Sequence, residues 1–334
     1  WPIAGTAVYM TSYPRTDEDR DWEDILPVRQ WLYQTPEQIL IKASNGASDF
    51  GNKFGQPLIT GSVLTFEHQE NGERYGYDKV IMLAGGVGYG TKRDCLKGTP
   101  QKGNKVVVVG GDNYRIGLGG GSVSSVDTGR YSSGIELNAV QRANPEMQKR
   151  ANNLVRALCE EDVNPVVSIH DHGSAGHVNC LSELVEECGG LIDMSKLPIG
   201  DKTLSSKEII ANESQERMGL LIQEEHIEHV RKIAERERAP MYVVGETTGD
   251  AHFAFQQADG VRPFDLDVAQ MFGHSPKTYM RDNTVERKYE DVTYDEAKLN
   301  EYVARVLRLE AVACKDWLTN KVDRSVTGKV ARQQ

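Results

Sequence analysis

The stretch SIHDHGSAGHVNC, residues 168–180, carries the densest group of side chains able to do chemistry. A β-branched run ends at His170, Asp171 and His172, and glycines then lead into a helical pattern. Proteins built from strands and helices place functional side chains at such strand ends. Because Mg²⁺ favours one or two carboxylates plus substrate oxygens, Asp171 is a candidate metal ligand. The structural alternative is a carboxylate that caps the following turn.

A zinc site is a second interpretation of the same stretch, because histidine is a common zinc ligand and the stretch contains His170, His172 and His177. However, His170 and His172 alternate across the expected strand, and the chain has neither an HExxH motif nor a CxxC pair. Zinc sites depend on such spacings. The pattern therefore favours magnesium shared with phosphate over zinc.

A glycine-rich segment, RIGLGGGSVSS at 115–125, follows the expected strand KVVVVGG. Uncovered backbone N–H groups and serine hydroxyls can hold an anion, and a tight turn that needs positive φ is an equal alternative. Ser122 stands where the dinucleotide fingerprint needs its third glycine, which disfavours a free-standing NAD enzyme. The candidate phosphate-binding residues are Gly117, Gly119, Gly120, Gly121, Ser122 and Ser124.

A third polar segment, residues 212–216 (NESQE), directly precedes the apolar run RMGLLI. We expect a polar loop there, suited either to recognition of a small molecule or simply to solvent. Arg217 stands at the junction of the loop and the strand.

The elements that must position these residues follow from hydrophobic periodicity and capping patterns. Helices are expected at 35–54, 144–162 and 175–188, in the first two cases with Pro at the first helical position. Short apolar strands are expected at IAGTAVYM, PLITGSVLTF, KVIMLAGGVG, KVVVVGG, NPVVSIH, RMGLLI, PMYVVGETT and AHFAFQQ. Strands and helices in this arrangement indicate α+β layers.

The bulk composition narrows the class of protein. A chain of 334 residues predicts two domains, or one domain with substantial attachments. Its net charge of −10 argues against a nucleic-acid surface. No apolar run reaches the ~18 residues that span a bilayer, so we expect a cytoplasmic protein without a membrane partner. Five scattered cysteines indicate reduced, mostly buried thiols. The start at Trp1 and the end at VTGKVARQQ are those expected of a piece of a longer polypeptide.

Eight ordered stretches together resemble one enzyme family: ASNGASDFGNKFGQP, KVIMLAGGVG, VVGGDNYRIGLGGGSVSS, AVQRANPEMQKR, SIHDHGSAGHVNCLSELV, NESQERM, ERAPMYVVGETTGD and WLTNKVDRSVTGKVARQQ. The chain resembles formylglycinamide ribonucleotide amidotransferase, also called phosphoribosylformylglycinamidine synthase, of the long single-chain type. The resemblance covers essentially the whole chain, as an internal fragment of the synthetase portion.

The resemblance implies an α+β fold similar to aminoimidazole ribonucleotide synthetase, with the end of an A domain followed by a complete B domain of layered sheet and helices. Residues 1–100 would form the C-terminal part of the first synthetase A domain. Residues 101–275 would form the first B domain, and 276–334 a helical or extended linker into the second A domain.

The implied activity is that of an ATP-dependent carbon–nitrogen ligase in de novo purine biosynthesis, with Mg²⁺ as cofactor and ATP as a substrate. Formylglycinamide ribonucleotide and glutamine give the amidine. ATP phosphorylates the amide oxygen of the ribonucleotide, and ammonia released from glutamine then displaces this phosphorylated oxygen. The implied partners are the ribonucleotide and the remainder of the same polypeptide, namely a second synthetase half and a glutaminase domain.

By the same resemblance, Gln141, Asp171, Ser214, Gln215 and Glu216 line the substrate site, Asp171 binds Mg²⁺, and the glycine-rich segment lies near the phosphates. HDHGSAGH stands where the family commonly has HDxGAGGL, so Ser174 and His177 depart from the pattern. The family's catalytic base histidine and glutaminase cysteine have no match in this chain, so the chain alone is expected to be inactive. A non-catalytic binding or scaffold module of the same fold is the alternative.

Overall fold

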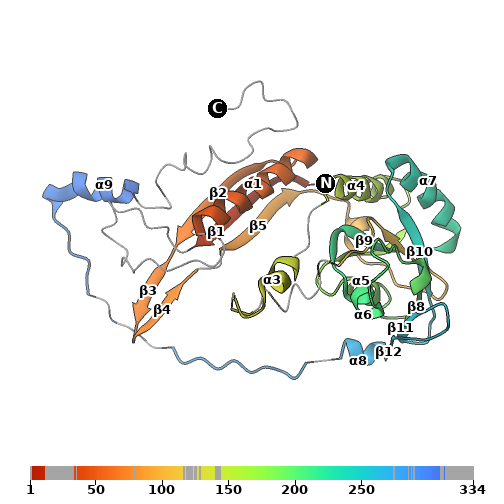
Figure 1. The fold of residues 1–334 in the computed structure, drawn as a ribbon. Helices are drawn as coiled ribbons and strands as arrows, with labels where there is room; N and C mark the ends of the chain where they lie inside the picture. Colours follow the sequence, from red (N-terminus) through yellow and green to blue (C-terminus); the bar gives the residue numbers. More distant parts are fainter. Residues whose placement is uncertain are drawn as a thin grey trace. The chain divides into compact units, whose positions relative to one another are not determined.

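The computed structural model describes residues 2–11, 34, 36–77, 80–115, 117, 123, 126–127, 129–139, 144–273, 275–284, 286, 288, 290–308 and 312. The chain forms two compact units (Figure 1). The first combines Trp1–Gly90 with Tyr279–Gln334, and the second is Thr91–Thr278. Among the described helices, none has the length and apolar character needed to cross a bilayer.

The first unit is built on β1 (Pro2–Thr11), which pairs in parallel with β2 (Leu58–Thr65) and antiparallel with β5 (Ile81–Gly88). Helix α1 (Pro36–Phe54) packs on one face, where Leu40 meets Ala7 and Tyr9 in a small core. Alternate residues of β1 are buried because side chains alternate across a strand. The expected helix and strands of this region are therefore confirmed.

The remaining elements of this unit are short or exposed. They are the hairpin strands β3 (Glu67–Glu70) and β4 (Glu73–Gly76), the single turn η4 (Glu296–Lys298) and the helix α9 (Leu299–Arg308).

The second unit contains, in its described residues, a seven-stranded sheet in the order β12-β11-β8-β10-β6-β9-β7. The strands are β6 (Lys105–Val109), β7 (Val166–His172), β8 (Gly190–Asp193), β9 (Ser214–Ile222), β10 (Met241–Thr247), β11 (His252–Gln256) and β12 (Phe264–Asp267). The helices are α3 (Ser133–Ala139), α4 (Pro145–Cys159), α5 (Gly176–Leu184), α6 (Ser206–Ala211), α7 (Ile227–Glu237) and α8 (Val268–Met271), with single turns η1 (Lys92–Cys95), η2 (Met194–Lys196) and η3 (Glu224–His226).

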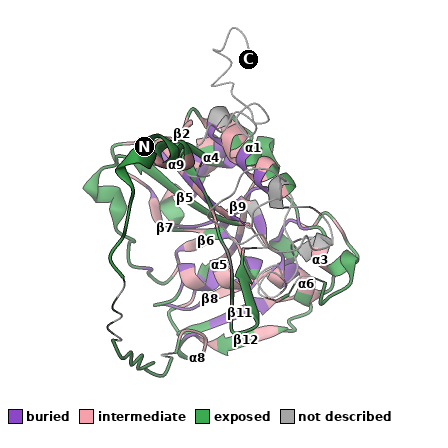
Figure 2. Cartoon of the chain, turned by 90° about the vertical axis from the view of Figure 1, so that its left-hand side faces the viewer, coloured by how far each residue is buried: buried purple, intermediate pink, exposed green. Residues whose placement is uncertain are grey.

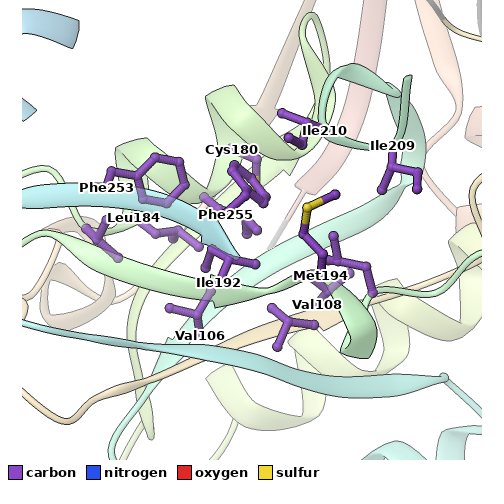
Figure 3. Packing of buried hydrophobic residues seen from close by; sticks show 14 of the residues in the cluster. Val106, Val108, Cys180, Leu184, Ile192, Met194, Ile209, Ile210, Phe253 and Phe255 are labelled. Carbon is purple, nitrogen blue, oxygen red and sulfur yellow. The ribbon is translucent and has the colours of Figure 1, made fainter. Parts of the chain in front are cut away.

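Strand β6 divides the core of this unit between the two faces of the sheet. Val106 and Val108 face a cluster with α5, α6, β8 and β11, in which Phe253 and Phe255 meet Ile192 and Leu184 (Figure 3). Val107 and Val109 face α4 and α7. Every second residue of KVVVV thus enters a different core, and this unit has helix, sheet and helix layers. Buried residues concentrate on the central strands (Figure 2).

Three element boundaries differ from expectation. Helix α5 ends at Leu184, because Gly189 N and Cys188 N both bond to the carbonyl of Val185 and close a turn there, so the helix expected at 175–188 is shorter. Strand β9 begins at Ser214, so the expected polar loop is wrong over 214–216, where the backbone is already strand. Helix α4 begins as expected, with Asn144 accepting a hydrogen bond from Met147 N at 3.1 Å, but it ends at Cys159, so the helix expected at 144–162 is shorter.

The segment before β6 is tied to the end of α4 by an exposed ion pair. Arg93 donates to the carbonyls of Glu161 and Asp162, and Asp94 accepts hydrogen bonds from Arg93, Thr91 and Asn164. These donors, the Arg93 guanidinium first, hold the pKa of Asp94 well below its ordinary value.

We expect the Asp94→Asn variant to be less stable than the parent at pH 7, and we expect this difference in stability to narrow as the pH falls from 4 to 2.5. A depressed folded-state pKa adds stability above the ordinary Asp pKa of about 3.9, and this contribution is lost as the pH falls toward the folded pKa. Urea unfolding of both proteins at pH 7, 4, 3 and 2.5 measures the difference. A gap between parent and variant that stays constant over this range would contradict the assignment.

Candidate functional site

Three segments of the second unit meet at one end of its sheet. Strands β6 and β7 both run antiparallel to β9, so their carboxyl ends lie beside the amino end of β9. These ends lead to Gly117, to Asp171 and to Ser214, Gln215 and Glu216. The structure therefore brings together candidate residues that are about a hundred positions apart in the chain.

The segment after β6 runs along residues 212–213. The side-chain amide of Asn212 donates to the carbonyl of Tyr114 at 2.6 Å, and Glu213 N donates to the carbonyl of Gly117 at 3.2 Å. Gly117 has φ of +76°, and a Cβ there would lie 2.7 Å from the Glu213 carbonyl oxygen. A positive-φ turn, the structural alternative for this glycine, is therefore present. Gly119, Gly120, Gly121, Ser122, Ser124 and Gln141 lie outside the described residues.

Asp171 is exposed near the end of β7. Its Oδ1 accepts a hydrogen bond from Gly173 N at 2.8 Å, which is the turn-capping role. Within the described parts of the chain, its second carboxylate oxygen makes no hydrogen bond. One oxygen thus fixes the local turn, and the other can face a ligand.

The start of β9 bulges against β7. Asp171 pairs with Met218 whereas His172 pairs with Ser214, so the intervening residues of β9 have no partner in the register. Bulges of this kind redirect side chains and are common beside active sites. Ser214 is buried, and its hydroxyl has no hydrogen-bond partner among the described residues. The Glu216 carboxylate lies close to Gly111, because a Cβ built on that glycine would be 3.5 Å from it. The side chain of Gln215 lies outside the described residues.

The three histidines do not form a metal site. His170 Nε2 lies 2.5 Å from the Glu183 carboxylate, whereas His172 Nε2 and His177 Nδ1 contact each other at 2.9 Å. Burial, and next the nearby Arg217 charge, lower the pKa of His172 and of His177 well below the ordinary value, so both rings are neutral. No cluster of three or more His, Cys, Asp or Glu side chains suited to a metal occurs in the part of the chain that the structure describes.

Arg217 is the main feature that sequence reasoning missed. It is fully buried, and its guanidinium donates to Asn113 Oδ1, to Asn212 O at 3.0 Å and Oδ1 at 2.6 Å, and to His177 Nε2 at 2.9 Å. The sequence placed Arg217 at the start of the apolar run RMGLLI, but nothing in this pattern predicts that its charged side chain is buried. The tertiary contacts show why it is buried.

The four cysteines that the structure describes are free, and two of them are buried. Cys180 and Cys188 are buried, Cys95 and Cys159 are exposed, and Cys314 lies outside the described residues, so the expectation of mostly buried thiols is only partly met. Burial raises the pKa of the Cys180 thiol far above its ordinary value, and this thiol lies 3.4 Å from the carbonyl of His170.

We expect iodoacetamide at pH 8 to alkylate Cys95 rapidly and to leave Cys180 unmodified in the folded protein. The thiolate is the nucleophile, and a buried thiol with a raised pKa forms almost none. Peptide mapping by mass spectrometry measures both sites, and unfolding in urea serves as the control that exposes Cys180. Equal labelling of both thiols without urea would contradict this expectation.

Known proteins similar to this chain identify its fold. Residues 101–257 match the family described as AIR synthase related protein, C-terminal domain. The second unit, with its sheet between helix layers, therefore defines the chain as a protein of the α+β, AIR synthase-like class. At the level of the fold, the chain is also similar to solved structures of Thermotoga maritima PurL.

These structures are PurL complexed with FGAR (TM-score 0.63, 21% identity, 88% of this chain and 43% of that one) and PurL complexed with ATP (TM-score 0.60, 18% identity, 91% and 43%).

Curated relatives are similar to this chain over almost its entire length. Along almost its entire length, the chain is homologous to a region of phosphoribosylformylglycinamidine synthase. It is 42% identical over 313 residues to that of Dictyostelium discoideum (90% of this chain, 23% of the relative). It is 36% identical over 356 residues to that of Homo sapiens (99% and 26%). The chain spans about a quarter of the length of these relatives.

Proposed function

We propose that this chain is the part of a phosphoribosylformylglycinamidine synthase that contributes one wall of its synthetase site. The observation that carries the proposal is the meeting of Gly117, Asp171 and the start of β9 at one sheet end, in a chain homologous to that enzyme throughout. The whole enzyme would be a cytoplasmic, ATP-dependent ligase that uses glutamine as its amido donor. It would convert formylglycinamide ribonucleotide to the amidine in purine biosynthesis.

This proposal keeps the three-part domain assignment expected from the sequence, although the second compact unit begins at Thr91 and the first unit includes Tyr279–Gln334. Residues 1–100 form the C-terminal part of the first A domain, 101–275 form the first B domain, and 276–334 lead into the second A domain. The family match over 101–257 supports the B-domain part. The second synthetase half and the glutaminase domain belong to the remainder of the polypeptide.

A magnesium ion fits the residues present. Asp171 offers an exposed carboxylate with only one oxygen engaged. The described residues contain no cluster of three or more His, Cys, Asp or Glu side chains suited to a metal, so substrate phosphates and water would supply the other ligands. Mg²⁺ is typically held by one or two carboxylates, with phosphate oxygens and water completing the octahedron. When bound there, the ion would neutralise charge on the transferring phosphate.

The work of the chain's own residues is to hold the substrates and to orient them. Phosphoryl transfer depends on positioning and on electrostatic stabilisation, so backbone N–H groups of the glycine-rich segment and the Ser214 hydroxyl are suitable parts. Ser214 supports this role because its hydroxyl is buried without a partner among the described residues, as expected for a group that awaits a ligand or water. Gln141, Gln215 and Glu216 complete the proposed wall.

The test is turnover by the full-length polypeptide supplied with ATP, glutamine, Mg²⁺ and formylglycinamide ribonucleotide. ADP and the amidine are expected in equal amounts, and no product is expected from residues 1–334 alone. Absence of both products from the well-folded full-length protein would refute the proposal. Product from the isolated chain would refute the assignment of the catalytic base to another part of the polypeptide.

A further inference from the structure

The buried guanidinium of Arg217 is bonded to neutral groups alone in the described part of the chain. Its partners are amide oxygens of Asn113 and Asn212, the Asn212 carbonyl and the ring of His177. No carboxylate contacts it there. Burial lowers the pKa of Arg217 to about 10, which still leaves it charged at neutral pH. The charges of Glu216 and Asp112 favour the protonated form of Arg217 without contacting it. A buried cation with no carboxylate in contact is costly, so its presence calls for a reason beyond stability.

The hydrogen bonds around Arg217 fix both histidine tautomers. Arg217 and the Asn113 amide, at 2.9 and 3.1 Å, both approach His177 Nε2, which must therefore accept. The proton of His177 then lies on Nδ1 and is donated to His172 Nε2 at 2.9 Å. A directional chain thus runs from Arg217 through His177 to His172, the neighbour of Asp171.

Each arm of this network ends beside one segment of the proposed site. Asn113 begins the backbone that leads to Gly117, His172 follows Asp171, and Asn212 precedes Ser214. These segments belong to different elements, and Arg217 is the residue that bonds to two of them directly and to the third through His177. A planar guanidinium with several donors is suited to such bridging, whereas a lysine offers one point of attachment.

Resting on the proposed function above, we propose that Arg217 is a positioning residue for the synthetase site, which holds these segments in one geometry and whose buried charge favours an anionic, phosphate-bearing ligand. Inside the protein this charge is weakly screened and acts over a longer distance than it would in water. The two effects are separable, because lysine keeps the charge without the fork and methionine removes both.

The experiment compares Arg217→Lys and Arg217→Met in the full-length protein by steady-state kinetics with MgATP and formylglycinamide ribonucleotide. We expect Arg217→Lys to lower kcat at least tenfold with each KM within threefold. Arg217→Met should lower kcat similarly and also raise the KM of a phosphate-bearing substrate at least tenfold. The stability control is Leu154→Ala, a buried change on α4, which should reduce the melting temperature and leave kcat and KM within twofold at 25 °C.

Kinetic constants of Arg217→Lys equal to those of the parent would overturn the proposal, as would losses no larger than those of Leu154→Ala. If Arg217→Met fails to fold, Arg217→Lys alone decides. Hydrogen–deuterium exchange separates this proposal from the proposed function. Even if the parent shows no turnover, Arg217→Lys should speed exchange in 111–117, 171–177 and 211–216 but not in α7, and unchanged exchange in those segments would refute positioning.

Discussion

The Asp171→Asn variant of the full-length protein is expected to lose at least tenfold in kcat/KM and to need more Mg²⁺ for half-maximal rate. Asparagine is nearly the same size as aspartate, and its side-chain oxygen can still accept the hydrogen bond from Gly173 N, so the turn is retained. What is lost is the negative charge that would hold the cation. A tenfold loss corresponds to about 1.4 kcal/mol of transition-state stabilisation.

The matched control for this change is Asp259→Asn. Asp259 is exposed in a loop, and its carboxylate accepts a hydrogen bond from Val261 N at 3.1 Å, two residues on, as Asp171 does from Gly173. Rates at several Mg²⁺ concentrations should be those of the parent for Asp259→Asn and reduced for Asp171→Asn. Equal rates for both variants would favour the non-catalytic binding or scaffold module.

The Gly176→Ala variant is expected to be strongly destabilised, with a free energy of unfolding about 3 kcal/mol or more below that of the parent. Gly176 begins α5 with φ of +55°, where a Cβ would lie 2.8 Å from Asn212 N and closer still to the carbonyl of that residue. The obstacle is backbone, so no change of rotamer relieves it. Asn212 must move, and with it an acceptor of Arg217.

Urea unfolding followed by circular dichroism measures this loss, and Gly134→Ala is its control. Gly134 lies in α3 of the same unit, has no positive φ, and a Cβ there would meet nothing within 4 Å. Because alanine is favoured over glycine inside a helix, the control should be neutral or slightly stabilised. A free energy of unfolding of Gly176→Ala within 1 kcal/mol of that of the parent would contradict this expectation, because Asn212 could then move away from the new Cβ at little cost.

Local patterns were sufficient for most elements of the fold. Asn144 and Pro145 placed the start of α4, and the unbroken run at Lys105–Val109 marked a strand buried on both faces. The same reasoning failed where tertiary pairing overrides local polarity. Residues 214–216 are polar, yet β9 begins at Ser214, because Ser214 pairs with His172 of the neighbouring strand β7.

The candidate site was partly predictable for a similar reason. Asp171 could be found because a strand end followed by glycines is a local signal, and the match to a family supplied the other segments. Arg217 could not, because a cation beside an apolar run ordinarily stays in water.

The sequence by itself therefore determined the α+β class and Asp171 as a candidate ligand, which depend on periodicity and on local motifs. Its resemblance to known enzymes indicated the family. Only the tertiary structure decided that Gly117, Asp171 and Ser214 meet at one end of the sheet, that two histidines are neutral hydrogen-bond partners, and that Arg217 is their buried neighbour. The physical reason is that burial and antiparallel pairing join residues about a hundred positions apart, and no local pattern records such contacts.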